Sequence, residues 1–423
     1  MGKKRNIVLA ILFLTWTISY MDRMVMTVAI PYISKEFNLT SVQMGVVMSA
    51  FFMGYTFFQL PGGMLSDKFG ARKVMTFAIA WWSAFTAFTG MITSYTSLLV
   101  VRVLFGLGEA SFPSGSWKTI STWFPKKERA TANSMMMAAS AIGTAIAPLF
   151  VVGIMSYFGW RSVFLFLFIP GIIIAALIWV FVRDNPAQSK MITPEELSVI
   201  QEDNSINEQD AANKEAVNKL SFKDIIKLPV MWKLFFLWLT FDIVFWGFGS
   251  WIPSYLVNER HFVMVKMGII ASLPYFAGTI GTWVSGYISD KFFVGKRRNF
   301  IIICEVAAAL FLFLTYNAPS EVLAITFLTV AGFFVCATMG AFWAIPMDIL
   351  PAEVMGSGSG FINTGGQIAG IISPIIMGFL IQASGGSYKT AFTFLAISSL
   401  VSAGFALSIN EKGKESSPKS ITT

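Results

Sequence analysis

The chain has 423 residues, of which 55% are hydrophobic and only 13% are charged, and its formal net charge is +8. This composition excludes a soluble domain of similar length, and basic residues scattered between apolar runs do not indicate nucleic-acid binding. The apolar runs are long enough for helices that cross a bilayer, whereas a membrane β-barrel would show short alternating segments. The sequence therefore predicts an all-α membrane protein.

Twelve membrane-spanning helices can be drawn in chain order. Their expected ranges are 7–30, 42–64, 74–93, 96–118, 131–155, 162–182, 229–256, 267–289, 299–316, 321–346, 356–382 and 389–409. Lys and Arg gather at both ends and on one set of connections, and the positive-inside rule then places both termini in the cytoplasm. Residues 183–228 are polar and acidic, and they predict a cytoplasmic linker rather than a catalytic domain.

The two halves of the sequence repeat each other. The string GGMLSDKF (62–69) returns as SGYISDKF (285–292), each after the second span of its half. We expect two pseudo-symmetric six-helix bundles, over 1–182 and 229–410, followed by a cytoplasmic tail over 411–423. Duplicated transporters of this kind bind substrate near the bilayer midplane at the interface of the repeats.

The first span carries Asp22 and Arg23, although a charge at membrane depth costs about 2.5–3.5 kcal/mol on insertion scales. Helical rotation places Tyr20, Arg23 and Thr27 on one stripe and turns Asp22 about 100° away. Arg23 can therefore face a central cavity and present its planar fork to a carboxylate. An internal ion pair that only holds the bundle together is the alternative.

The fourth span carries Arg102 and Glu109, which are seven residues apart and so lie on nearly the same helix face. An anion docking on the arginine, or a rearrangement of the pair, would change how strongly the acid binds a proton. This spacing favours a coupled Arg102–Glu109 pair, and a static buried pair is the alternative.

The second half supplies polar groups in place of charges. Trp343 can stack on a carbon chain, while Asn363 and Gln367 are four residues apart and share a helix face. Asp242 in the seventh span is a functional candidate because it is an acid at membrane depth. Glu305 is expected to pair with a base in a loop, and His261 to be a solvated loop residue. The two cysteines, Cys304 and Cys336, are expected to be packing residues.

The string Gly-x-x-x-Asp-Lys-x-Gly-x-Arg-Lys (63–73), echoed in the second half, resembles the signature loop of the major facilitator superfamily. Further motifs narrow this likeness: Tyr-x-Asp-Arg (20–23), Tyr55 before Gln-Leu-Pro-Gly-Gly (59–63), and Arg102 before Gly-x-Gly-Glu-Ala (106–110). Together they resemble the anion:cation symporter group, and most closely its bacterial proton-coupled carriers of galactonate, glucarate and hexuronates.

The resemblance implies a role for each matching residue. Arg23 would bind the substrate carboxylate, Tyr20 and Tyr55 would donate hydrogen bonds to substrate, and Asp22 and Glu109 would take up protons. Arg102, coupled to Glu109, is placed with the substrate-binding residues, as are Trp343, Asn363 and Gln367. Contacts of Asp67 with Lys68 and Arg72, and of Asp290 with Arg297, would hold a cytoplasmic gate.

The expected function is therefore import of a small sugar acid together with protons, by a monomer in the bacterial inner membrane. Neither a cofactor nor a metal is expected, and no catalytic set of an enzyme is visible. Organophosphate exchange is a second hypothesis, but carriers of that type place a further Arg in the seventh span, which has none here. Two further hypotheses are drug/proton antiport and a nutrient sensor built on the same fold.

Overall fold

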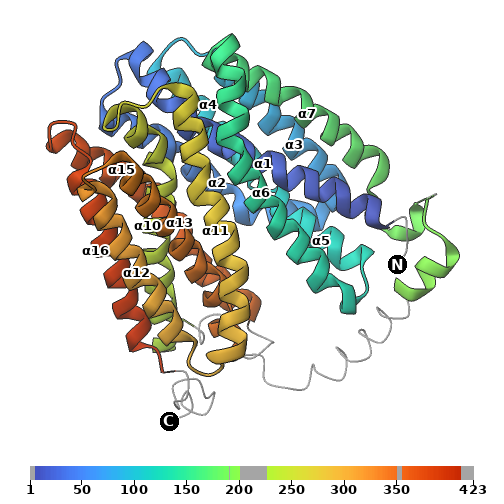
Figure 1. The fold of residues 1–423 in the computed structure, drawn as a ribbon. Helices are drawn as coiled ribbons and strands as arrows, with labels where there is room; N and C mark the ends of the chain where they lie inside the picture. The colour runs from blue at the N-terminus through green and yellow to red at the C-terminus, as the bar shows by residue number, and fades with distance from the viewer. Residues whose placement is uncertain (1–4, 190, 201–225, 350–354, 411–423) are drawn as a thin grey trace. The chain divides into compact units, whose positions relative to one another are not determined.

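In the computed structural model of the protein, residues 5–189, 191–200, 226–349 and 355–410 are described (Figure 1). All regular structure in these ranges is helical, and eleven helical segments are long and apolar enough to cross a membrane. The remaining expected span forms α3 (Ala71–Thr89), whose hydropathy is lowered chiefly by Arg72 and Lys73 in its first turn. The prediction of an all-α membrane protein is confirmed.

The chain divides into two compact units. Unit 1 comprises residues 1–29 and 50–218, and unit 2 comprises residues 30–49 and 219–423. Most of the predicted linker (201–225) and the predicted tail (411–423) lie outside the described residues.

Seven long helices belong wholly or partly to unit 1: α1 (Arg5–Phe37), α2 (Ser41–Phe69), α3, α4 (Tyr95–Glu109), α5 (Phe112–Trp123), α6 (Lys126–Phe158) and α7 (Trp160–Phe181). Helix α3 packs against α4, α5 and α7, while α6 packs against α5 and α7. A short 3₁₀ turn, η1 (Pro186–Gln188), follows α7.

The fourth span is broken directly after Glu109. Helix α4 starts at a capping box, in which Ser94 and Ser97 satisfy each other's backbone N–H groups, and it ends at Glu109. Pro113 lies in the first turn of α5, where a proline is tolerated because no helical N–H bond is needed there. The turn at Ala110 and Ser111 therefore puts the Glu109 carboxyl at a helix end.

Helices α2 and α4 cross closely because each has a glycine at the contact. A Cβ atom on Gly54 would overlap the carbonyl oxygen of Val103, and one on Gly106 would overlap the carbonyl oxygen of Phe51. This crossing places Phe51 and Tyr55 of α2 beside the polar residues of α4.

Gly106→Ala is expected to lower the thermal unfolding midpoint in detergent, because the added methyl group must push the two backbones apart at a cost of about 1–3 kcal/mol. Gly153→Ala in α6 is the matched control, since nothing lies within 4 Å of a Cβ there. Alanine is a better helix former than glycine, so the control should be neutral or stabilising. Equal midpoints for the two variants would contradict this role of Gly106.

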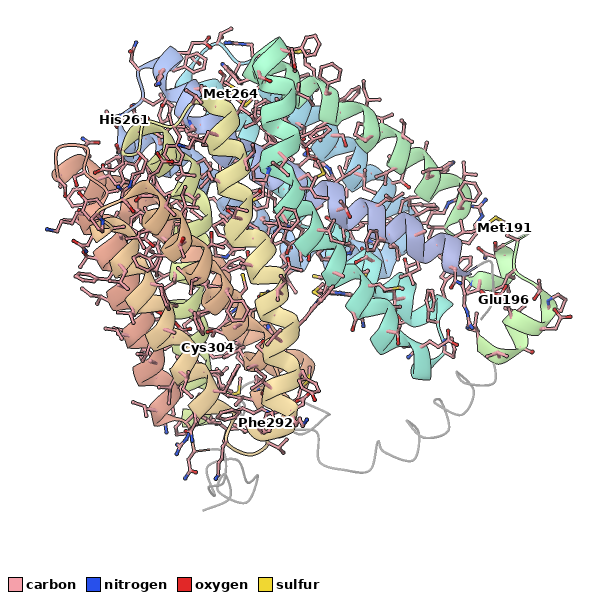
Figure 2. The ribbon with its side chains drawn as sticks, viewed as in Figure 1. Met191, Glu196, His261, Met264, Phe292 and Cys304 are labelled. Atoms are coloured by element: carbon pink, nitrogen blue, oxygen red, sulfur yellow. The ribbon has the colours of Figure 1, made fainter. Side chains whose placement is uncertain are left out.

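The N-terminal end of α1 is held to two other segments of unit 1. Arg5 Nη2 lies 3.0 Å from Glu128 Oε1 of α6, and Arg5 Nε lies 3.9 Å from Glu196 Oε1. Glu196 belongs to the helical stretch 194–200, labelled in Figure 2, and both it and Arg5 are buried. The described start of the linker thus packs on unit 1.

Unit 2 contains the helices α10 (Pro229–Asn258), α11 (Met264–Phe292), α12 (Arg297–Asn317), α13 (Glu321–Phe342), α14 (Ala344–Ile349), α15 (Met355–Ala383) and α16 (Lys389–Ser408). Helix α12 packs against α13 and α16 just as α3 packs against α4 and α7, and α10 packs against α15 and α16. The tenth span is broken at Trp343, as the fourth is broken after Glu109. The repeat seen in the sequence therefore extends to packing and to the broken helices.

Candidate functional site

The centre of the candidate site in unit 1 is an ion pair between α1 and α4. Arg23 Nε donates to Glu109 Oε1 at 2.7 Å, and the Ser19 hydroxyl donates to the same oxygen. Ser19 and Arg23 are four residues apart, so both lie on the face of α1 that meets the end of α4. Arg23 lies on the predicted stripe, but its guanidinium already has an acid partner.

Three aromatic rings surround the Arg23 guanidinium. Its Cζ atom lies 4.8 Å from the ring centroid of Tyr20 and 4.9 Å from those of Phe51 and Tyr55. Cations are attracted to ring faces at such distances, and the rings also displace water from the ion pair. The Glu109 bond uses Nε, so it does not involve the two terminal guanidinium nitrogens.

Arg102 makes no direct ion pair with Glu109 in the described part of the chain, although the charge of Glu109 acts on it. Glu109 pairs with Arg23 instead, while Arg102 Nε has no hydrogen-bond partner in the described part of the chain. The Arg102 guanidinium lies 4.8 Å from the Phe105 ring centroid and still feels the charges of Glu109 and Asp22. Seven residues along one helix separate two side chains by about 10 Å, whereas α1 brings Arg23 directly opposite Glu109.

Asp22 points away from Arg23, as the helical rotation predicted. Its side chain is buried, and within the described ranges neither carboxyl oxygen has a hydrogen-bond partner. Trp82 of α3 lies near it, and its indole nitrogen also has no hydrogen-bond partner there. Burying a charged carboxylate without donors is expensive, and binding a proton removes that cost.

The predicted residues of unit 2 are found near the break in the tenth span and on α15. Trp343 lies at the break, and its ring centroid is 5.0 Å from that of Trp238 on α10. Asn363 and Gln367 lie on α15 and are partly exposed, and Gln367 Oε1 has no partner in the described residues. The sequence interpretation missed Trp238, as it missed Ser19 in unit 1.

The predicted pairing of Glu305 with a loop base is wrong. Glu305 on α12 is buried, and its described partners are hydroxyls of α16: Ser399 Oγ lies 2.5 Å from Oε2, and Ser402 Oγ lies 3.2 Å from Oε1. Ser399 Oγ is also 2.8 Å from the Glu305 carbonyl oxygen. A hydroxyl has one hydrogen, so if Ser399 donates to the carbonyl, the carboxyl must donate to Ser399.

Glu305→Gln is accordingly expected to unfold within a few degrees of wild type, because the amide N–H can replace the acid O–H. Glu305→Leu should lower the unfolding midpoint, since it removes the side-chain hydrogen bonds to Ser399 and Ser402 and leaves each hydroxyl only a backbone acceptor. Loss of such a hydrogen bond costs about 0.5–1.5 kcal/mol. Thermal unfolding in detergent measures both variants. A glutamine variant as unstable as the leucine variant would show that the carboxyl is charged.

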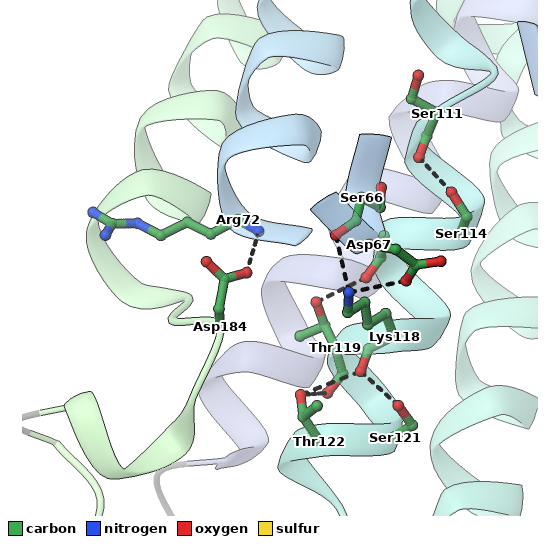
Figure 3. Close-up of polar contacts among 11 residues, drawn as sticks. Ser66, Asp67, Arg72, Ser111, Ser114, Lys118, Thr119, Ser121, Thr122 and Asp184 are labelled. Atoms are coloured by element: carbon green, nitrogen blue, oxygen red, sulfur yellow. Dashed lines mark hydrogen bonds and ion pairs between the residues drawn. The ribbon is translucent and has the colours of Figure 1, made fainter. Parts of the chain in front are cut away.

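The gate contacts in unit 1 differ from the prediction. Asp67 does not contact Arg72; instead Lys118 of α5 donates to Asp67 Oδ1 at 2.9 Å and to the Ser66 carbonyl at 3.0 Å (Figure 3). Arg72 comes after the turn at Gly70, which has φ 91°, and its backbone N–H donates to Asp184 while its side chain donates to the Trp179 carbonyl. The turn thus directs Arg72 to the end of α7.

The corresponding contact in unit 2 matches the prediction. Arg297 Nη1 lies 2.6 Å from Asp290 Oδ1 and also donates to Ser289 Oγ. Lys68 lies with its Nζ atom 5.3 Å from the Phe69 ring centroid, and no described acid pairs with it. His261 lies in the turn between α10 and α11, and Cys304 is buried in α12 (Figure 2). Whether the contacts of Asp67 and Asp290 form a gate remains a prediction.

Comparisons with known proteins agree with this architecture. A model of the Major Facilitator Superfamily matches residues 12–374. The chain belongs to the major facilitator superfamily, as its motifs predicted, and it is therefore a multi-pass membrane transporter rather than an enzyme.

Several curated relatives of similar length are named as carriers of sugar acids, and one at 30% identity is named as a probable sulfoacetate transporter of Cupriavidus necator, over 92% of this chain and 90% of the relative. The chain is 29% identical to a hexuronate transporter of Bacillus subtilis, over 92% of this chain and 91% of the relative. It is 29% identical to a probable galactarate/D-glucarate transporter of Escherichia coli (strain K12), with coverages of 94% and 92%. It is 31% identical to a D-galactonate transporter of Escherichia coli O6:H1, with coverages of 95% and 94%.

Solved structures share the fold at lower identity. A D-xylose-proton symporter matches with a TM-score of 0.75 at 15% identity, over 97% of this chain and 100% of that one. A bacterial homologue of the lysosomal transporter Spinster matches with a TM-score of 0.73 at 21% identity, with coverages of 96% and 95%. These matches confirm the fold alone.

Proposed function

We propose that this protein is a proton-coupled symporter that imports a sugar acid by alternating access. The observation that carries the proposal is the Arg23–Glu109 ion pair inside a ring of aromatic side chains. The names of the relatives support a hexonate, hexuronate or aldarate as substrate. The protein would work as a monomer in a bacterial inner membrane, with both termini cytoplasmic and no cofactor other than the proton.

In this proposal, substrate and Glu109 compete for one guanidinium. A charged Glu109 holds Arg23, and an opposite charge at about 4 Å is worth about 4 kcal/mol at an effective dielectric of 20. A proton on Glu109 removes that attraction and makes Arg23 available to a substrate carboxylate. Proton binding and anion binding then favour each other, which is the requirement for symport.

Other residues would complete the site. Asp22, buried without donors, is the second proton acceptor, and Arg102 provides a further positive charge for the anion. Tyr20 and Tyr55 lie against Arg23, where their hydroxyls would orient the substrate. Trp343, Asn363 and Gln367 would contact the hydroxylated carbon chain.

Uptake into proteoliposomes tests the proposal. We expect an inward proton gradient to drive accumulation of at least one of D-galactonate, D-glucuronate and D-glucarate, and a protonophore to abolish that accumulation. Acetate and inorganic phosphate are the controls, because they lack the hydroxylated chain. Uptake of none of the three sugar acids, or uptake that is indifferent to the proton gradient, would overturn the proposal.

A further inference from the structure

The strongest unassigned group in unit 2 is a pair of buried polar side chains on α10, Trp238 and Asp242. They are four residues apart, so they share one face of the helix. Trp238 is 4% exposed and Asp242 6%, and both lie near the middle of α10 (Pro229–Asn258). Neither group has a hydrogen-bond partner within the described residues: the Trp238 indole nitrogen is buried without one, and burial is the only influence found on the Asp242 carboxyl.

The pair packs directly against α15. A Cβ atom on Gly366 would overlap Asp242 Oδ2 and would come within 2.7 Å of Trp238 Nε1. Gly366 is three residues after Asn363 and directly before Gln367, so all three belong to one side of α15. The absence of a side chain at position 366 thus lets both polar atoms of α10 reach the side of α15 that carries Asn363 and Gln367.

Trp238 is also held rigidly by aromatic contacts. Its ring stacks on Phe342 with centroids 4.4 Å apart, and it meets Trp343 edge-on at 5.0 Å. An indole fixed in this way cannot rotate its N–H toward another acceptor. An unpaired donor therefore lies beside an unpaired carboxylate, next to three residues already expected to contact substrate.

We propose that Trp238 and Asp242 bind one hydroxyl group of the substrate and so select hydroxylated acids. A hydroxyl both donates and accepts, so it satisfies the two groups together by donating to Asp242 and accepting from Trp238 N–H. An ammonium group donates only and leaves the indole unpaired. This inference rests on the proposed sugar-acid transport and adds the determinant that separates polyhydroxy acids from simple ones.

The test is a double-mutant cycle in which one change is made in the protein and the other removes a hydroxyl from the substrate. The KM for uptake is measured for each combination. Asp242→Leu removes the acceptor at similar size, and Trp238→Phe preserves the ring while removing the N–H. Both are compared with Trp283→Phe on α11, whose side chain is largely exposed. The substrates are whichever of D-galactonate, D-glucuronate and D-glucarate the wild type transports, and the analogues of that acid lacking one hydroxyl each.

Each site variant is expected to raise KM for the full substrate about fivefold to a hundredfold, as leaving a buried hydrogen-bonding group without its partner does. One of the deoxy analogues lacks the hydroxyl that the pair binds. For that analogue, wild type and both site variants should have equal KM. An unchanged KM, or an equal penalty for every analogue, would overturn the inference. Loss of proton-driven accumulation at unchanged KM would also overturn the inference, because it would make Asp242 a proton site.

If the wild type transports no sugar acid, or if Arg23→Lys transports normally, the proposed function itself has failed.

Discussion

Arg23→Lys is expected to reduce sugar-acid uptake about a hundredfold or more. Lysine keeps the charge but loses the planar fork, and its ammonium group cannot serve Glu109 and a substrate carboxylate at once. Each hydrogen bond to a charged group is worth about 1.5–3 kcal/mol, so loss of the two bonds of the fork corresponds to at least a hundredfold in affinity. Initial uptake rates and KM in proteoliposomes measure the effect.

The alternative for Arg23 is a purely structural ion pair, and the same variant distinguishes the two. A structural role predicts a lower unfolding midpoint with near-normal KM in whatever protein remains folded. Arg161→Lys at the start of α7 is the control, because that guanidinium lies over Trp160 in another part of unit 1. Normal uptake by folded Arg23→Lys would remove Arg23 from the substrate site.

Glu109→Gln is expected to separate substrate binding from proton coupling. Glutamine cannot hold Arg23 as a charged acid does, so the variant should bind substrate about tenfold or more tightly than wild type at high pH. Substrate binding by wild type should depend on pH, because proton and anion binding favour each other, whereas binding by the variant should stay flat. Substrate exchange should persist, and accumulation driven by a proton gradient should be lost.

Binding measured from pH 5 to pH 8, together with gradient-driven uptake, checks this result. Asp22→Asn serves as the comparison, because the Asp22 carboxyl makes no hydrogen bond in the described structure, so its replacement leaves the direct Arg23–Glu109 ion pair in place. That variant should keep the pH dependence of binding. Proton-driven accumulation by Glu109→Gln equal to that of wild type would contradict the proposed competition.

The fold was predictable because the membrane restricts the options. Apolar runs of spanning length admit only helices, and the repeated Ser-Asp-Lys-Phe string revealed the duplication by itself. Charged residues inside those runs were equally informative, since Asp22, Arg23, Arg102 and Glu109 would each be costly at membrane depth without a purpose.

Partners between helices were not predictable in the same way. Periodicity gives the face on which a residue lies, but not the helix that packs against that face. Arg102 was therefore paired with an acid of its own helix, while Arg23 of α1 is the actual partner of Glu109. Glu305 was given a loop base for the same reason, although its contacts are serines of α16.

Asp67 and Asp242 show the same limit. The acid of the signature loop pairs with Lys118, a residue of α5 that lies outside the motif. Asp242 had no recognisable motif, and the two features that single it out are Trp238 on its own helix and a glycine of α15. A serine four residues before an intramembrane arginine, as Ser19 is before Arg23, was the one local signal that the sequence interpretation missed.

The guanidinium, the acid that competes for it and the rings around them all belong to unit 1. Exchange of one anion for another at Arg23 would therefore involve side chains of one compact unit. In the proposed mechanism, substitutions confined to that unit can tune which anion is captured.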